Sequence, residues 1–98
     1  MREDDRQARV KERERATLAR QIFDNPLWDE AYTSLVNRQL ERMLAKAADG
    51  EETLECKRSV LALRDLKGYL ETIMQTGKLA QAQLEKDQED GRKRNATA

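Results

Sequence analysis

The sequence predicts an all-α protein built on an antiparallel helical hairpin, and three features predict it. The first is the pair Asn25-Pro26: asparagine is a favoured N-cap, and proline suits the first helical position, where no N–H partner is lost. The second is a set of apolar residues that recur at three- and four-residue spacing both before and after residues 49–50. The third is Asp49-Gly50, a reversal signal in which we expect Gly50 to be left-handed.

The composition favours self-association. At 98 residues the chain has room for one small domain, and a core of that size usually needs oligomerisation or covalent staples. One cysteine and no histidine exclude a disulfide scaffold and leave no basis for a metal cluster, so we expect no cofactor. Cys56 lies on an apolar helix face, which predicts a buried side chain and not a reactive thiol.

Three segments follow from the pattern. Residues 1–24 are rich in helix-forming charged side chains and predict a charged N-terminal helix. Residues 25–84 form the predicted core: helices at about 26–47 and 52–75, and a helical extension that continues through Gly77, with or without a bend. A helix ending at Gly77 is the alternative. Residues 85–98 are polar, and from Asp90 we expect disorder. Whether residues 1–17 are ordered without a partner stays open.

The charges are unevenly placed although their sum is zero. Residues 24–56 carry three basic and eight acidic side chains, and residues 57–84 carry five basic and two acidic ones. An acidic segment beside a basic one favours antiparallel pairing of the two. It does not indicate a strong nucleic-acid surface, which needs a clear basic excess.

Catalytic groupings are absent from the sequence, so we expect no enzyme and no small-molecule substrate. The paired carboxylates lie in first helical turns, and without a histidine no serine or tyrosine has an evident activating base. Two interpretations of the basic residues stay open: contact with DNA or a partner, or a helix face that is simply solvated. The basic residues concerned are Arg2, Arg6, Arg9, Arg13, Arg20, Arg92, Lys93 and Arg94. For the core, or for a self- or partner interface, we select Trp28, Tyr32, Leu35, Leu63, Leu70 and Ile73.

The pattern also resembles a known group of proteins. Asn25-Pro26-Leu27 followed by Asp29-Glu30-Ala31, then Leu63-Arg64-Asp65-Leu66, and finally Gly77-Lys78-Leu79-Ala80, is similar to small helical proteins from the head-assembly and DNA-packaging modules of tailed bacteriophages. The resemblance covers residues 18–84 and rests mostly on residues that start or end helices. It implies a small-terminase-like component that oligomerises, binds double-stranded DNA and serves a large packaging ATPase. The chain lacks an evident helix-turn-helix module, which puts specific DNA recognition in doubt.

Two further hypotheses stay open. One is a small regulator that presents Trp28 and Tyr32 to another protein, such as a host factor, and blocks it. The other is plain nonspecific DNA binding. No apolar run approaches the roughly 18 residues of a membrane span, and with one thiol we expect a cytoplasmic protein, in the host cytoplasm if phage-encoded. The sequence specifies neither the subunit count nor the partner.

Overall fold

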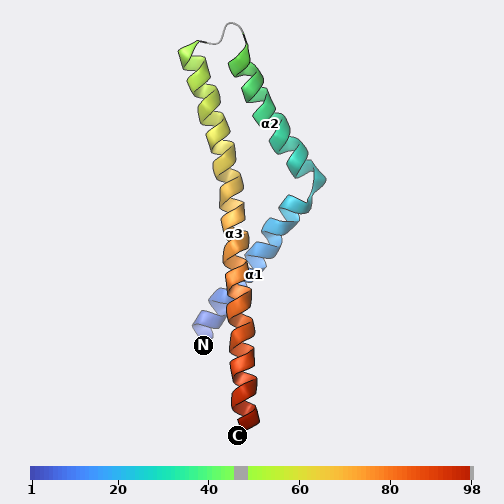
Figure 1. The fold of residues 1–98 in the computed structure, drawn as a ribbon, viewed down its shortest axis with the longest axis vertical. Helices are drawn as coiled ribbons and strands as arrows, with labels where there is room; N and C mark the ends of the chain where they lie inside the picture. Colours follow the sequence, from blue (N-terminus) through green and yellow to red (C-terminus); the bar gives the residue numbers. More distant parts are fainter. Residues whose placement is uncertain (46–48, 98) are drawn as a thin grey trace. The chain divides into compact units, whose positions relative to one another are not determined.

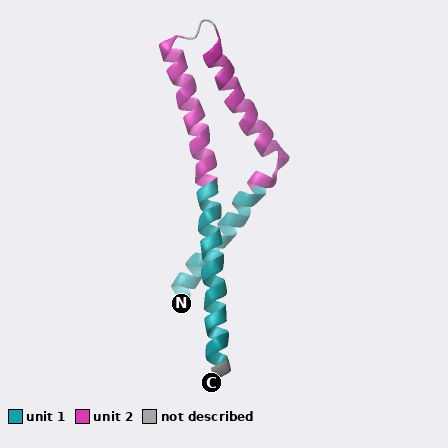
Figure 2. Ribbon diagram, in the orientation of Figure 1, with its two compact units in different colours: residues 1–21, 71–98 teal, residues 22–70 magenta. Residues whose placement is uncertain are grey.

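All regular structure in the described part of the chain, residues 1–45 and 49–97, is α-helical in the computed structural model. The helices are α1 (Glu3–Asp24), α2 (Pro26–Leu44) and α3 (Gly50–Thr97), in that order (Figure 1). The all-α prediction is therefore confirmed. The chain divides into two compact units, unit 1 (Met1–Gln21 and Glu71–Ala98) and unit 2 (Ile22–Leu70), and each is described by itself (Figure 2).

Local capping sets the start of α2 and of α3. The side-chain oxygen of Asn25 accepts a hydrogen bond from the Leu27 N–H at 2.9 Å, and its carbonyl accepts one from the Trp28 N–H at 2.9 Å. Asp49 acts in the same way: its carboxylate accepts from the Glu52 N–H at 2.7 Å. These contacts satisfy backbone donors that have no partner inside a helix. The start at Pro26 agrees with the prediction, whereas α3 begins at Gly50, before the predicted start at about residue 52.

Three of the boundary predictions have different outcomes. Gly50 is the first residue of α3 and is not left-handed, since no glycine in the described residues has a positive φ. The predicted end of the second helix at about Ala47 falls outside the described residues; α2 as described ends at Leu44. The third helix does not stop at residue 75 but continues through Gly77, as favoured, so the alternative of a C-cap there is wrong.

The expected disordered tail is also helical, because α3 continues to Thr97. Two contacts explain why composition alone misjudged it. Lys93 and Glu89, one turn apart, form an ion pair at 3.4 Å that supports the helix. Asp87, shortly before, pairs with Arg6 of α1 at 2.6 Å, a contact between residues 81 apart in sequence that local composition cannot indicate.

In unit 1, α1 lies antiparallel to the second half of α3. Arg6 meets Asp87 and Arg13 meets Gln81, so rising residue numbers in α1 face falling ones in α3. The helices come closest at Gly77: a methyl group there would overlap the Cβ of Ala16 and lie 3.2 Å from the Glu12 carbonyl oxygen. This close approach allows small and apolar residues to be buried together, namely Ala19, Gly77, Ala80 and Leu84.

In unit 2, α2 lies antiparallel to residues 50–70 of α3, which is the predicted hairpin. Arg42 lies 3.7 Å from Glu52 near the turn, and the Lys67 ammonium lies 5.0 Å from the centre of the Tyr32 ring further along. The two helices draw apart from the turn toward Pro26 (Figure 1). Cys56, which lies near the turn, is fully buried, as predicted.

Among the described residues no ion pair joins the acidic segment to the basic one, although Lys67 of the basic segment lies over Tyr32 of the acidic segment. The described ion pairs between the helices of the hairpin connect Arg42 with Glu52 and Glu55, and all three residues belong to the acidic segment 24–56. Which charged side chains meet depends on the position of each residue along the antiparallel helices. The net charge of a long segment does not determine it.

The contact at Gly77 gives a first prediction. Gly77→Ala should lower the free energy of unfolding by about 1–3 kcal/mol, because the added methyl meets Ala16 and the backbone of α1 in a packed crossing. Gly68→Ala is the matched control in the same helix. Nothing lies within 4 Å of its added Cβ, so the better helix propensity of alanine should stabilise by up to about 1 kcal/mol.

Urea unfolding followed by circular dichroism, at one protein concentration, measures both changes. If Gly77→Ala were as stable as Gly68→Ala, the close crossing of α1 and α3 would be contradicted.

Candidate functional site

The side chains selected for the core or an interface lie mostly at half-buried positions. Trp28, Tyr32, Leu63, Leu70 and Ile73 are all intermediate in exposure. Leu35 differs, since 38% of it is exposed, and as a core residue it was a wrong choice. The next residue of α2, Val36, is the one that is partly buried. Leu35 therefore lies on the more exposed flank of the helix. Its role in an interface stays a prediction.

Trp28 is the centre of an aromatic cluster in unit 2. Its ring meets Phe23 edge-on, with centroids 5.3 Å apart, and stacks on Tyr32 at 5.9 Å. Lys67 from α3 lies over the Tyr32 ring and adds a cation–π contact. The rings therefore contact one another within the unit, and Lys67 links the cluster to α3.

Around this cluster the hairpin leaves much apolar surface open. Cys56 is the single buried residue of unit 2 in the part of the chain that the structure describes. By contrast, nine large apolar side chains of the unit are exposed: Ile22, Leu27, Leu35, Leu40, Leu44, Leu54, Leu61, Leu66 and Tyr69. Scattered exposed leucines are ordinary, but many exposed apolar side chains on two paired helices are typical of a surface that meets a partner.

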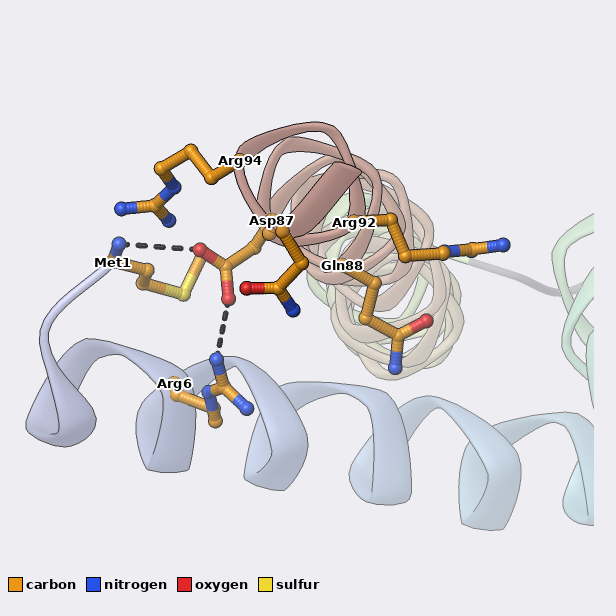
Figure 3. A pocket seen from close by; sticks show the side chains of 8 residues that line it. Met1, Arg6, Asp87, Gln88, Arg92 and Arg94 are labelled. Atoms are coloured by element: carbon orange, nitrogen blue, oxygen red, sulfur yellow. Dashed lines mark hydrogen bonds and ion pairs between the residues drawn. The ribbon is translucent and has the colours of Figure 1, made fainter. Parts of the chain in front are cut away.

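The basic residues of α1 divide into two groups by their position around the helix. Arg6 donates to Asp87, and Arg9 pairs with Glu12 at 2.9 Å and donates to Gln83 at 3.4 Å. Figure 3 shows Asp87 between the Met1 ammonium and the Arg6 guanidinium, in an open depression of about 530 Å³. These two arginines hold unit 1 together, which leaves them poorly placed to contact phosphate.

A second group lines a groove without carboxylates. Arg13, Arg20 and Lys78 surround a depression of about 380 Å³, whose other lining residues are Ala16, Thr17, Met74, Gly77 and Gln81. We call it the basic groove. Three cations and no acidic side chain make it suited to an oxyanion. Lys78 was not selected from the sequence, because its meeting with α1 depends on the helix crossing.

Hydrogen bonds orient one cation of the basic groove. Glu85 accepts a hydrogen bond from the Gln81 side-chain nitrogen at 2.8 Å, which turns the Gln81 oxygen toward α1. That oxygen then accepts a bond from Arg13 at 3.2 Å. Arg13 is thus positioned at the groove by a carboxylate that does not itself line it.

The remaining predicted basic contacts lie elsewhere. Arg2 is exposed near the start of α1. Lys93 pairs with Glu89, and Arg92 shares a depression with Glu85 and Glu89, so carboxylates accompany both. Arg94 lines the depression at Asp87 and lies near Met1 in Figure 3. The structure thus gathers Arg13 and Arg20 of the predicted set and separates the others.

Other kinds of site find no support in the described residues 1–45 and 49–97. No group of three histidine, cysteine, aspartate or glutamate side chains there could hold a metal ion. In the same ranges no helix has the length and apolar character to cross a lipid bilayer. Comparison with protein-family models, curated proteins and solved structures finds no match to this chain.

The contacts of Asp87 predict a pH dependence. The hydrogen bond from the Met1 ammonium, with the charges of that ammonium and Arg6, lowers the pKa of Asp87, while partial burial acts in the opposite direction. Ionised Asp87 therefore stabilises the fold above about pH 4, the ordinary aspartate range. This stabilisation is lost as the pH falls through the lowered pKa.

Asp87→Asn should accordingly melt below the wild type at pH 7, and the two melting curves should converge as the pH falls below about 4. Asp90→Asn, three residues further along α3, is the matched control and should change little. Thermal unfolding by circular dichroism between pH 2 and pH 7 tests this. A difference between Asp87→Asn and wild type that did not vary with pH would contradict the assignment.

Proposed function

We propose that this chain is a non-enzymatic helical protein that assembles with copies of itself through the hairpin of unit 2. The observation that carries the proposal is the contrast, within the described residues of that unit, between nine exposed large apolar side chains and one buried residue. Covering a large apolar side chain gives about 1.5–3 kcal/mol, so a second hairpin laid on this surface would stabilise both. A charge of zero overall leaves little repulsion between copies.

We further propose a role in phage head assembly or DNA packaging, as a small-terminase-like component in the host cytoplasm. The resemblance around Asn25-Pro26-Leu27 and Gly77-Lys78-Leu79-Ala80 supports the role, and the basic groove supports contact with double-stranded DNA. A large packaging ATPase would be the further partner. The groove can contact phosphates, but it offers no recognition helix for base edges, so the binding proposed is independent of sequence.

The alternative of a regulator that presents Trp28 and Tyr32 to a host protein is less well supported. Those rings stack on each other, and each is already half-buried within unit 2. An aromatic hot spot offered to a partner is more effective when its faces are free.

Self-assembly predicts a concentration-dependent mass. Native mass spectrometry and light scattering after size exclusion should show a discrete species larger than a dimer, which dissociates on dilution. Monomer at all concentrations would contradict the proposal. One host protein bound in stoichiometric amount would favour the regulator instead.

The basic groove gives a separate prediction for DNA. If its cations meet phosphates, Arg20→Ala with Lys78→Ala should weaken binding to any duplex and reduce the slope of log K against log salt by about 2. Arg92→Ala with Lys93→Ala removes the same charge beside carboxylates and should have a smaller effect.

Fluorescence anisotropy with two duplexes of unrelated sequence, over a salt series, measures this. Equal effects of the two double variants would contradict the groove as the contact site. Size exclusion of each variant shows separately whether self-assembly is intact.

A further inference from the structure

The depression at Asp87 in unit 1 holds more cations than its one carboxylate can balance. Residues from the start of α1 and from the last turns of α3 line it: Met1, Arg6, Asp87, Gln88, Gly91, Arg92, Arg94 and Asn95. Among these lining residues Asp87 is the only acid, beside the Met1 ammonium and three guanidinium groups. Four positive charges and one negative charge leave the lining with a net charge of +3.

Asp87 itself is already engaged by two of these cations. Its side chain is 10% exposed, and its two oxygens accept from the Met1 ammonium at 3.1 Å and from Arg6 at 2.6 Å. Figure 3 shows the Arg94 guanidinium next to that ammonium, on the same side of the carboxylate. The negative end of the α3 dipole favours one basic residue in the last turn, but it does not explain a second cation beside it. An anion bound between Arg94 and Met1 would offset their repulsion.

Gly91 keeps the depression open. Gly77, Leu84 and Gly91 follow one another at seven-residue spacing, so they lie on nearly the same line of α3, the line that faces α1. The first two are buried, and a methyl group at Gly77 would overlap Ala16. At Gly91, by contrast, an added Cβ would meet nothing within 4 Å. A larger side chain at this position would extend into the space of about 530 Å³ that glycine leaves free.

The excess of positive charge is confined to this side of Asp87. A second depression, of about 410 Å³, shares Met1 and Asp87 and is otherwise lined by Asp5, Arg9, Gln83, Lys86 and Asp90. Its three carboxylates balance its three cations, so it offers no net attraction to an anion. The depression beside Gly91 is therefore the one in which an oxyanion is favoured.

We infer that the depression beside Gly91 binds the phosphate group of a phosphate monoester, with Arg94 and the Met1 ammonium as its charged contacts. At pH 7 such a group carries a charge of about −1.5 to −2 and presents three acceptor oxygens. A guanidinium can pair with two of these oxygens at once, and the side-chain amides of Gln88 and Asn95 supply further donors at the rim. Arg6 stays with Asp87, and this pair holds α1 in place beside the ligand.

This site differs from the basic groove in the anion that it fits. A phosphodiester in a DNA strand carries one negative charge and has two free oxygens, so it uses the three charges of this lining less fully. The inference goes beyond the proposed contact with DNA and does not depend on it. A bound phosphate would join the start of α1 to the last turns of α3 and stabilise unit 1.

Isothermal titration calorimetry of the full chain with inorganic phosphate tests the inference, at a constant ionic strength set with chloride. Dimethyl phosphate is the matched probe, because it has the single charge of a diester. We expect one phosphate per chain and binding of dimethyl phosphate weaker by about tenfold or more. Equal binding of the two probes, or heats with phosphate that do not differ from those with chloride, would overturn the inference.

Variants of adjacent residues assign the site. Arg94→Gln should weaken phosphate binding by about tenfold or more, and Arg94→Lys, which keeps the charge but loses the fork of donors, by less. Lys93→Gln is the matched control, since Lys93 pairs with Glu89 and lies outside the depression. Circular dichroism verifies that each variant is helical. An equal loss in Lys93→Gln, or a loss that follows Arg20→Ala with Lys78→Ala instead, would place phosphate elsewhere and overturn the assignment.

The source of the phosphate group is distinguished with one oligonucleotide, prepared with and without a 5′-phosphate. Tighter binding of the phosphorylated form, lost in Arg94→Gln, would identify the end of a nucleic-acid strand as the ligand. Equal binding of the two forms, with free phosphate still bound, would identify a small phosphorylated molecule. Neither result bears on self-assembly through unit 2, which the mass of the wild type tests separately.

Discussion

The close crossing of α1 and α3 at Gly77 is the constraint on which unit 1 depends. Gly77 has no side chain, so Ala16 can lie directly against the α3 backbone. Larger residues on both helices would hold the axes apart, because interhelical distance follows the size of the side chains at the contact. The crossing buries Ala19, Ala80 and Leu84, and it brings Lys78 to the arginines of α1. Packing and the basic groove therefore have one cause.

Unit 2 has no equivalent of that crossing. Its α2 and α3 are close near the turn, where Cys56 is buried, and separate toward Pro26. The aromatic rings of Phe23, Trp28 and Tyr32 contact one another near that end. Two helices alone offer each residue at most one neighbouring helix, so most of the apolar surface of a hairpin cannot be covered from within. Leucines on both helices of the hairpin are exposed for this reason, and the proposed self-assembly would cover them.

The features that the sequence predicts correctly are those that contacts between residues close in sequence determine. Asn25 and Pro26 set the start of α2 through contacts two or three residues away, and that start agrees with the structure. Asp49 caps α3 in the same way, but the sequence predicted a reversal there and a helix from about residue 52. The helical end of α3 could not be predicted in this way, because it is supported by the pairing of Asp87 with Arg6 across 81 residues. The basic groove was missed for the same reason. Arg13 and Arg20 were visible as cations, but only the crossing angle of two helices brings Lys78 to them.

The division of the basic residues shows why net charge is a poor guide to function in this chain. With equal numbers of acidic and basic side chains, the sequence as a whole predicts no attraction to a polyanion. The structure places carboxylates against Arg6, Arg9 and Lys93, and leaves the groove at Arg20 and Lys78 without any. Because phosphate is attracted by the potential within a Debye length of about 8–10 Å, this local arrangement matters more for the proposed anion contact than the net charge does. The nine exposed apolar side chains of the hairpin belong to unit 2 and the groove to unit 1, so the proposed self-assembly and the proposed anion contact can be tested by separate substitutions.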